Sequence, residues 1–264
     1  MYDATFVSNG TTFVLGTDNN IVFDINDLSG NDVELGLSQG SSQVGQTVDR
    51  KAVSGNTITI KGVIYGDVQS GKMALRHAFA PFREGVLYFG DYYLNVVVKH
   101  SPTFSPIKNR GGFQMQLFAP YPFWRKTEPT VLEIDTENAP SSVYTLTNNG
   151  DIDVPYNKIT IEETAPDSQD ITITNTATNE YLKFNLELLP DQIIELYRDS
   201  NNVLRADLIE NGVRTDILYA IDAGSTLWTV HVGDNPYSIT SSNSGGYLQI
   251  SIEINEVVGG VYET

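Results

Sequence analysis

The 264-residue sequence has no cysteine, which excludes disulfide bonds and thiolate metal sites. It also has no stretch near the roughly 18 consecutive apolar residues that a membrane-spanning helix requires. Its first ten residues lack the basic start and apolar run of a signal peptide, so we expect no secretory leader. The apolar share is still 40%, which is enough for a hydrophobic core, so we do not expect a disordered chain.

Basic residues are scarce in the second half of the chain. Residues 1–130 hold 11 basic and 11 acidic residues, so 5 of the 16 basic and 22 of the 33 acidic residues remain for 131–264. We interpret this asymmetry as two domains in different surroundings. A neutral domain can pack against its own copies, whereas an acidic one repels them and favours outward positions. A solubility adaptation explains the asymmetry equally well. Neither half has the basic stripe of a nucleic-acid-binding protein.

Familiar catalytic motifs are missing too. There is no nucleophile elbow, glycine-rich phosphate loop or EF-hand, and the three histidines lack the spacing of a zinc site. Acidic residues cluster at Asp151 and Asp153, at Glu162 and Glu163, and between 167 and 170. We interpret these clusters as solvated turns, with a surface calcium site as the alternative. We therefore expect no enzyme activity, no catalytic residues, no cofactor and no assigned metal ligand.

The stretch 56–125 has the most specific pattern in the chain. A strand at 56–65 is followed by a helix at 70–84, and a hairpin at 86–100 turns at its Gly-Asp pair. An alternating strand at 113–119 then runs into an aromatic and proline-rich stop at 120–125. This is the only helix that the sequence predicts among strands.

The helix prediction depends on capping and periodicity. Ser70 is the expected N-cap, and Leu75, Ala78, Phe79 and Phe82 follow the spacing of one apolar helix face. A proline and a glycine near residue 84 end the pattern.

Two polar segments of the first half have two interpretations each. Residues 38–46 are rich in glycine, serine and glutamine, and residues 101–112 contain two prolines and two basic residues. Each is either a flexible surface loop or an arm that orders only against a neighbouring subunit.

After residue 125 the pattern changes, and we place a domain boundary between 130 and 131. Alternating strands separated by Asn-Gly and similar turns predict an antiparallel β-sandwich. These strands are expected at 158–161, 170–174, 181–188, 227–232 and 247–254.

Aromatic residues suggest two further roles. Phe123 and Trp124 lie where the first domain ends, so we expect them to pack between the domains. Trp228 lies inside a predicted strand, where core packing is favoured over stacking on a sugar. A protein rich in tyrosine could nevertheless be a carbohydrate-binding module that recognises host cell-wall glycans, and this is the alternative function.

Several short motifs occur in a fixed order along the chain. They are LFAPYPFWR at 117–125, LTNNGDIDVPYNKITI at 146–161, YRDS at 197–200, NG at 211–212, LWTVHVGDN at 227–235 and GV at 260–261. Together with the order of strand, helix and hairpin at 56–100, they resemble the distal tail proteins (Dit) of siphophages, the long-tailed, non-contractile phages. The sequence departs from that family at His231-Val232, where a proline usually precedes the glycine.

The resemblance implies a mainly β fold. Residues 1–130 would form a tail-tube-like β-barrel or β-sandwich with one α-helix and a hairpin, and residues 131–264 a galectin-like antiparallel β-sandwich. It also implies a homo-hexameric ring, the baseplate hub that connects the tail tube protein to the tail-tip protein and to receptor-binding proteins. Genomic DNA would pass through the ring without specific binding. The protein would be assembled in the bacterial cytoplasm and reside in the virion, at the tail tip.

For this ring we expect the hairpin at 86–100 and the strand at 113–119 to pair edge to edge between subunits. The ring-interface candidates are Leu94, Val96, Val98, Phe113, Met115 and Leu117. The carbohydrate-binding alternative does not explain the helix in the first domain, and the His-x-Asn-Pro-Arg pattern of a galectin sugar site is missing. A wall-degrading hydrolase would rest on the unassigned acids alone.

Overall fold

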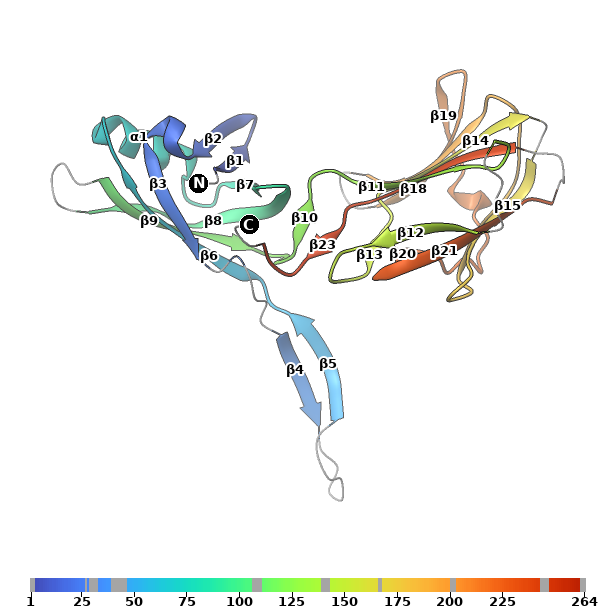
Figure 1. The fold of residues 1–264 in the computed structure, drawn as a ribbon, viewed down its shortest axis with the longest axis horizontal. Helices are drawn as coiled ribbons and strands as arrows, with labels where there is room; N and C mark the ends of the chain where they lie inside the picture. The colour runs from blue at the N-terminus through green and yellow to red at the C-terminus, as the bar shows by residue number, and fades with distance from the viewer. Residues whose placement is uncertain are drawn as a thin grey trace. The chain divides into compact units, whose positions relative to one another are not determined.

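The computed structural model describes residues 3–26, 28, 33–38, 47–105, 111–138, 143–165, 168–199, 203–242 and 247–261. Within these ranges the chain is built of antiparallel strands and one α-helix (Figure 1). The prediction of a mainly β fold is therefore confirmed. The chain divides into two compact units, unit 1 (Met1–Thr127 with Val258–Thr264) and unit 2 (Glu128–Val257).

The C-terminal end differs from the domain that we expected for it. All of 131–264 was expected to form one domain, but Val258–Thr264 groups with unit 1. Val261 is buried in the core of unit 1, and its N–H donates a hydrogen bond to the carbonyl of Leu28 at 3.3 Å. Burial of this apolar residue explains why the end of the chain returns to the first unit.

Unit 1 is built on one antiparallel sheet with the main strand order β2-β1-β7-β8-β9-β6-β3. Two further strands extend it, since β10 pairs with β8 and β23 pairs with β10. The strands are β1 (Ala4–Ser8), β2 (Thr11–Leu15), β3 (Ile21–Asn26), β6 (Asn56–Ile64), β7 (Glu84–Phe89), β8 (Tyr92–Phe104), β9 (Gly111–Ala119), β10 (Trp124–Lys126) and β23 (Val257–Val258). A short 3-10 helix, η1 (Thr17–Asn19), joins β2 to β3.

The α-helix, α1, spans Val68–Ala78, so its predicted limits were wrong at both ends. Asp67 is the N-cap, and its carboxylate accepts hydrogen bonds from the Ser70 N–H at 3.1 Å and the Ser70 hydroxyl at 2.8 Å. These bonds lower the pKa of Asp67. Ser70 therefore lies in the first turn, because an aspartate three residues earlier provides the acceptor that an N-cap requires.

The C-terminal limit of α1 follows from a proline. Pro81 disfavours helical geometry at the preceding residue, and the chain leaves the helix after Ala78. Phe82 then takes a left-handed φ of 61° and donates its N–H to the carbonyl of Val98 at 3.2 Å. Its side chain is 86% exposed, so the prediction that Phe82 belongs to the buried helix face was wrong.

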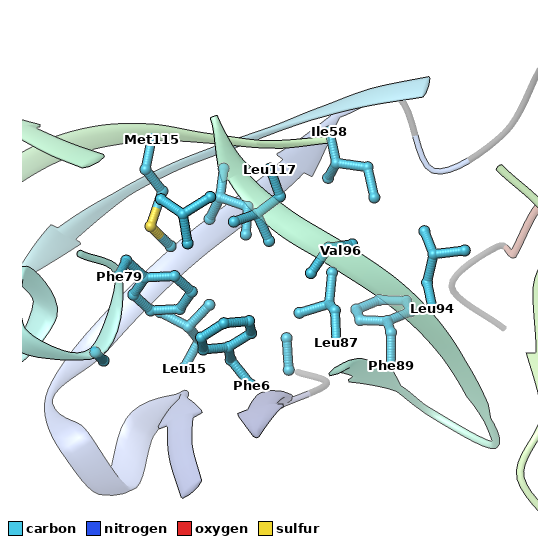
Figure 2. Packing of buried hydrophobic residues seen from close by; sticks show 14 of the residues in the cluster. Phe6, Leu15, Ile58, Phe79, Leu87, Phe89, Leu94, Val96, Met115 and Leu117 are labelled. Carbon is cyan, nitrogen blue, oxygen red and sulfur yellow. The ribbon is translucent and has the colours of Figure 1, made fainter. Parts of the chain in front are cut away.

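The core of unit 1 lies between the sheet and α1 (Figure 2). Phe79 is fully buried and stacks on Phe6 with 4.7 Å between ring centroids, and Phe13 meets the same ring edge-on at 5.8 Å. Leu75 and Ala78 are buried as predicted. The core thus joins the helix to β1 and β2, which are distant from it in the sequence.

Unit 2 is an antiparallel β-sandwich of two sheets, with strand orders β11-β22-β14-β17-β18-β19 and β12-β21-β15-β16. A small pair, β13 with β20, completes it. The strands are β11 (Thr130–Asp135), β12 (Tyr144–Asn148), β13 (Val154–Pro155), β14 (Lys158–Ala165), β15 (Ser168–Asn175), β16 (Tyr181–Leu188), β17 (Ile193–Arg198), β18 (Leu204–Glu210), β19 (Val213–Asp216), β20 (Thr229–Val230), β21 (Gly233–Thr240) and β22 (Tyr247–Ile254). A 3-10 helix, η2, spans Leu218–Ala220.

Alternate residues of these strands are buried, such as Ile159 and Ile161 in β14 and Leu182 and Phe184 in β16. The predicted strand at 227–232 is shortened to the two residues of β20. The reason is a turn before it, in which the indole N–H of Trp228 donates to the carbonyl of Ser225 at 3.0 Å. Trp228 is half-buried.

Candidate assembly interface

The six ring-interface candidates lie in the core of unit 1. None is more than 5% exposed, and Figure 2 shows Leu94, Val96, Met115 and Leu117 pointing into the common interior. Strand β8 pairs with β7 on one side and β9 on the other, and β9 pairs with β6. The prediction that the hairpin and the strand at 113–119 pair edge to edge between subunits was therefore wrong, because both are inner strands of one chain.

The two interdomain candidates have different surroundings. Trp124 is 1% exposed and belongs to the core of unit 1. Phe123 is half-buried, with its ring 5.2 Å from that of Tyr121, and the Arg125 guanidinium lies 5.0 Å from the Tyr121 ring. A role for Phe123 and Trp124 between the units stays a prediction.

The free sheet edges of unit 1 are elsewhere. Strands β2 and β3 end the main strand order, so each has one side without a partner strand in the described part of the chain. An edge strand presents backbone N–H and C=O groups that can pair with another chain. Val22 of β3 and Thr11 and Thr12 of β2 are exposed. These two edges are positions where another chain could extend the sheet.

A second candidate surface is a two-stranded ribbon, which we call the arm. It consists of β4 (Val33–Ser38) and β5 (Thr47–Val53), which pair only with each other in the described chain. The ribbon continues away from β3 and β6 (Figure 1). Most of the polar segment predicted at 38–46 lies outside the described residues. An isolated two-stranded ribbon has only marginal stability in water, so the arm is a segment that a neighbour could order.

One face of the arm, which we call the apolar face, holds several exposed apolar side chains. Leu35 and Leu37 alternate along β4, and the register places Leu37 opposite Val48 and Leu35 opposite Lys51. Leu35 is 51% and Leu37 48% exposed, and Val48 and Val53 are exposed as well. An exposed apolar patch of this kind is typical of a protein interaction site. Glu34, also exposed, alternates with the leucines and lies on the opposite face.

A groove of about 640 Å³ lies beside the β3 edge. Its apolar lining includes Phe23 and Phe113, and its charged lining includes Asp24 and Lys61, which are register partners on β3 and β6. Gly62 lets the Val22 carbonyl and the Phe113 ring lie close to the β6 backbone, because a Cβ there would be 2.5 Å from that carbonyl oxygen and 2.7 Å from the ring. The groove can therefore accept apolar side chains next to a free strand edge.

In unit 2 at least four of the five basic residues are paired with acids. Arg214 contacts Glu195 at 2.7 Å and Asp207 at 3.2 Å, and Lys158 contacts the same Glu195 at 2.7 Å. These partners lower the pKa of Glu195 against the effect of its partial burial and raise that of Arg214. Lys183 and Arg205 have carboxylate partners too. Because 22 acids face 5 bases in residues 131–264, most of the acid excess remains uncompensated.

Within the described ranges, no three histidine, aspartate or glutamate side chains gather in a way that could hold a metal ion. Over the same residues, no helix has the length and apolar character needed to cross a membrane.

Comparisons with known proteins give a fold match. No family model and no curated protein matches the chain. Among solved structures, the Dit protein (gp 19.1) of phage SPP1 aligns with 96% of this chain and 98% of its own at a TM-score of 0.69 and 10% identity. The chain has the fold of a Dit protein. That protein is described as a paradigm of the hub adsorption apparatus in phages that infect Gram-positive bacteria.

The fold of this chain is also matched by chains of the phage p2 baseplate. Two structures of its activated conformation, with Sr and with Ca, align at TM-scores of 0.50 and 0.51, each at 10% identity. They cover 96% and 95% of this chain and 98% of the matched chains. The resemblance inferred from the sequence motifs is thus supported across both units. At 10% identity, the likeness is one of fold.

An arm at 38–46 was one of the two interpretations of the sequence, but the ribbon of β4 and β5 on either side of it and the β3 groove were missed. No strand was predicted at 47–53, because charged residues interrupt the apolar pattern there. The signal that could have found the arm is the alternation of Leu35 and Leu37 with polar residues, followed across a polar loop by Val48. The groove has no such signal, since it depends on how β3, β6 and β9 pair.

Proposed function

We propose that this protein is a non-enzymatic structural component of a phage tail, the baseplate hub at the tail tip. In this proposal it forms a homo-hexameric ring that connects the tail tube protein to the tail-tip protein and to receptor-binding proteins. The observation that carries the proposal is the likeness to SPP1 Dit, which spans 96% of this chain and 98% of that chain. Because the match extends over both units, it favours the role of a whole Dit protein over the sharing of one domain with unrelated proteins.

Two surfaces of unit 1 support the proposal of a ring. A ring forms when one surface of each copy binds a different surface of the next copy and the rotation closes. We propose that the apolar face of the arm is the first surface and that the β3 edge with its groove is the second. Burial of Leu35 and Leu37 would remove exposed apolar side chains from water. A strand of the next copy could pair with the free side of β3.

Charge supports the same arrangement. Residues 1–130 have no net charge, so copies of unit 1 can approach without a large Coulomb cost. Unit 2 holds the acid excess, which favours a peripheral, solvated position where copies are farther apart. A channel wall without clusters of basic residues would also let DNA pass, since phosphate contacts would retain it. We propose the virion as the site of the mature protein and the host cytoplasm as the site of its assembly.

Light scattering after size-exclusion chromatography tests the ring. We expect a species with a mass near six times the 29.1 kDa of one chain, together with ring-shaped particles in negative-stain electron microscopy. Ring formation depends on concentration, so the measurement should extend to tens of micromolar. A strict monomer at that concentration, with no rings on the grid, would contradict the proposal. Rings with another number of subunits would still support the hub function but would contradict the hexameric state.

A further inference from the structure

Three loops of unit 2 meet at a single histidine. His231 lies between β20 and β21, and its Nδ1 is 2.9 Å from an oxygen of Asp153. Its Nε2 is 2.9 Å from an oxygen of Glu180. Asp153 lies between β12 and β13, and Glu180 lies between β15 and β16. The second oxygen of Asp153 accepts the N–H of Val232 at 2.9 Å. One ring therefore joins three connections that are far apart in the sequence.

The position of His231 is set by its backbone. The His231 N–H donates to the side-chain oxygen of Asn235 at 3.1 Å, and the Asn235 amide donates back to the His231 carbonyl at 2.7 Å. Asn235 is buried, and Asn175 donates to its oxygen at 3.1 Å. The buried Asn235 and Asn175 thus fix the backbone of this turn to the sandwich, while the imidazole, 35% exposed, reaches the two carboxylates at the surface.

Only the protonated imidazole can satisfy this geometry. A carboxylate accepts hydrogen bonds, so both ring nitrogens must donate, and both carry a proton only in the imidazolium form. A neutral ring would donate to one carboxylate and direct a lone pair at the other. The hydrogen bonds that the ring donates to Glu180 and then to Asp153 raise the pKa of His231, and the histidine lowers the pKa of both carboxyl groups.

The other titratable groups near His231 do not take part in its hydrogen bonds to the two carboxylates. The hydroxyls of Tyr156 and Tyr237 are hydrogen-bonded to each other at 3.1 Å and lie close enough to Glu180 to respond to its charge. Burial raises the pKa of Tyr237 to about 12 and that of Tyr156 well above its usual value, so both stay neutral. Asp234, in the same turn as His231, accepts a hydrogen bond from Thr147 at 2.7 Å.

We propose that His231, Asp153 and Glu180 form a proton-controlled clasp that holds these three loops of unit 2 together and releases them as the pH rises. With the imidazolium present, each nitrogen binds one carboxylate and the loops are held together. Loss of one proton removes one of the two bonds and leaves two carboxylates around a neutral ring, which frees one loop. This inference concerns unit 2 alone and does not depend on the proposed hub function.

The pH range in which the clasp is closed follows from the directions in which the pKa values of its three groups are shifted. The histidine pKa is raised above 6.5 in the folded protein, so its contribution is complete below pH 6.5 and is lost as the pH rises through the raised value. The carboxyl pKa values are lowered from 3.8 for Asp153 and 4.5 for Glu180. Their contribution is therefore complete above pH 4.5 and is lost as the pH falls through the lowered values. The clasp is closed between these limits and opens on the alkaline side first.

Proton NMR of the full chain tests the clasp, because only three histidines contribute signals. We expect the His231 ring to titrate above 6.5, and Asp153→Asn and Glu180→Gln each to move its midpoint down towards 6.5. The variant His77→Gln identifies one of the other signals and serves as the control, since it should leave the His231 midpoint unchanged.

Hydrogen exchange of the wild-type chain gives a second measurement that needs no variant. After correction for the intrinsic rate, the protection of the Val232 amide should fall by about three- to tenfold between about pH 5.5 and about pH 8.5. Amides in the centre of β14 should keep their protection over the same range. The proposal is overturned if His231 titrates at or below 6.5, or if the protection of Val232 is the same at both pH values.

Discussion

Truncation of Phe79 to alanine should lower the free energy of unfolding of unit 1 by about 3–5 kcal/mol. The side chain is fully buried between α1 and the sheet, stacked on Phe6 at 4.7 Å and edge-on to Phe13 at 5.8 Å. Alanine would leave a cavity that the surrounding strands cannot fill without breaking their pairing. The measurement is chemical denaturation followed by tryptophan fluorescence. A Trp228→Phe background leaves Trp124, in the core of unit 1, as the single reporter.

The matched control lies three residues away. Phe82→Ala removes the same ring from a position that is 86% exposed, so we expect a change within about 0.5 kcal/mol. The left-handed backbone at residue 82 is strained with phenylalanine and with alanine alike. This strain therefore does not contribute to the difference in the free energy of unfolding. Equal losses from the two substitutions would contradict the packing of Phe79 and the exposure of Phe82.

The second large effect concerns assembly. The double variant Leu35→Ser/Leu37→Ser should abolish ring formation at concentrations where the wild-type chain forms rings. Two leucines that move from about half exposed to buried would contribute about 2–3 kcal/mol per contact. Their loss should weaken each contact by a factor of about 30–150. Light scattering of both proteins over the same concentration series measures the difference.

The control for this variant uses the opposite face of the same ribbon. Glu34→Ser changes an exposed residue of β4 that does not share the apolar face, so rings should persist. Denaturation of the leucine variant should match that of the wild-type monomer, since neither leucine belongs to the core of unit 1. If the rings of the leucine variant survive at the wild-type concentration, the arm is not the surface that holds them.

Individual strands of this protein were predictable because their signal is local. In β16 and β22, buried and exposed residues alternate, and the predicted ranges 181–188 and 247–254 coincide with the observed strands. The helix was predictable for the same reason, since Leu75, Ala78 and Phe79 repeat with its period. Its limits were not, because a capping aspartate three residues before the predicted start and a backbone hydrogen bond to β8 decide them.

The sequence by itself determined the mainly β fold, the single helix, the neutral first half and the acidic second half. These follow from periodicity and composition, which each segment carries without reference to the rest. The tertiary structure alone decided which strands are inner and which are edges. An alternating strand such as β8 or β9 has the same pattern whether its partner belongs to the same chain or to another. The meeting of Asp153, Glu180 and His231 also required the folded sandwich, because three separate connections bring them together.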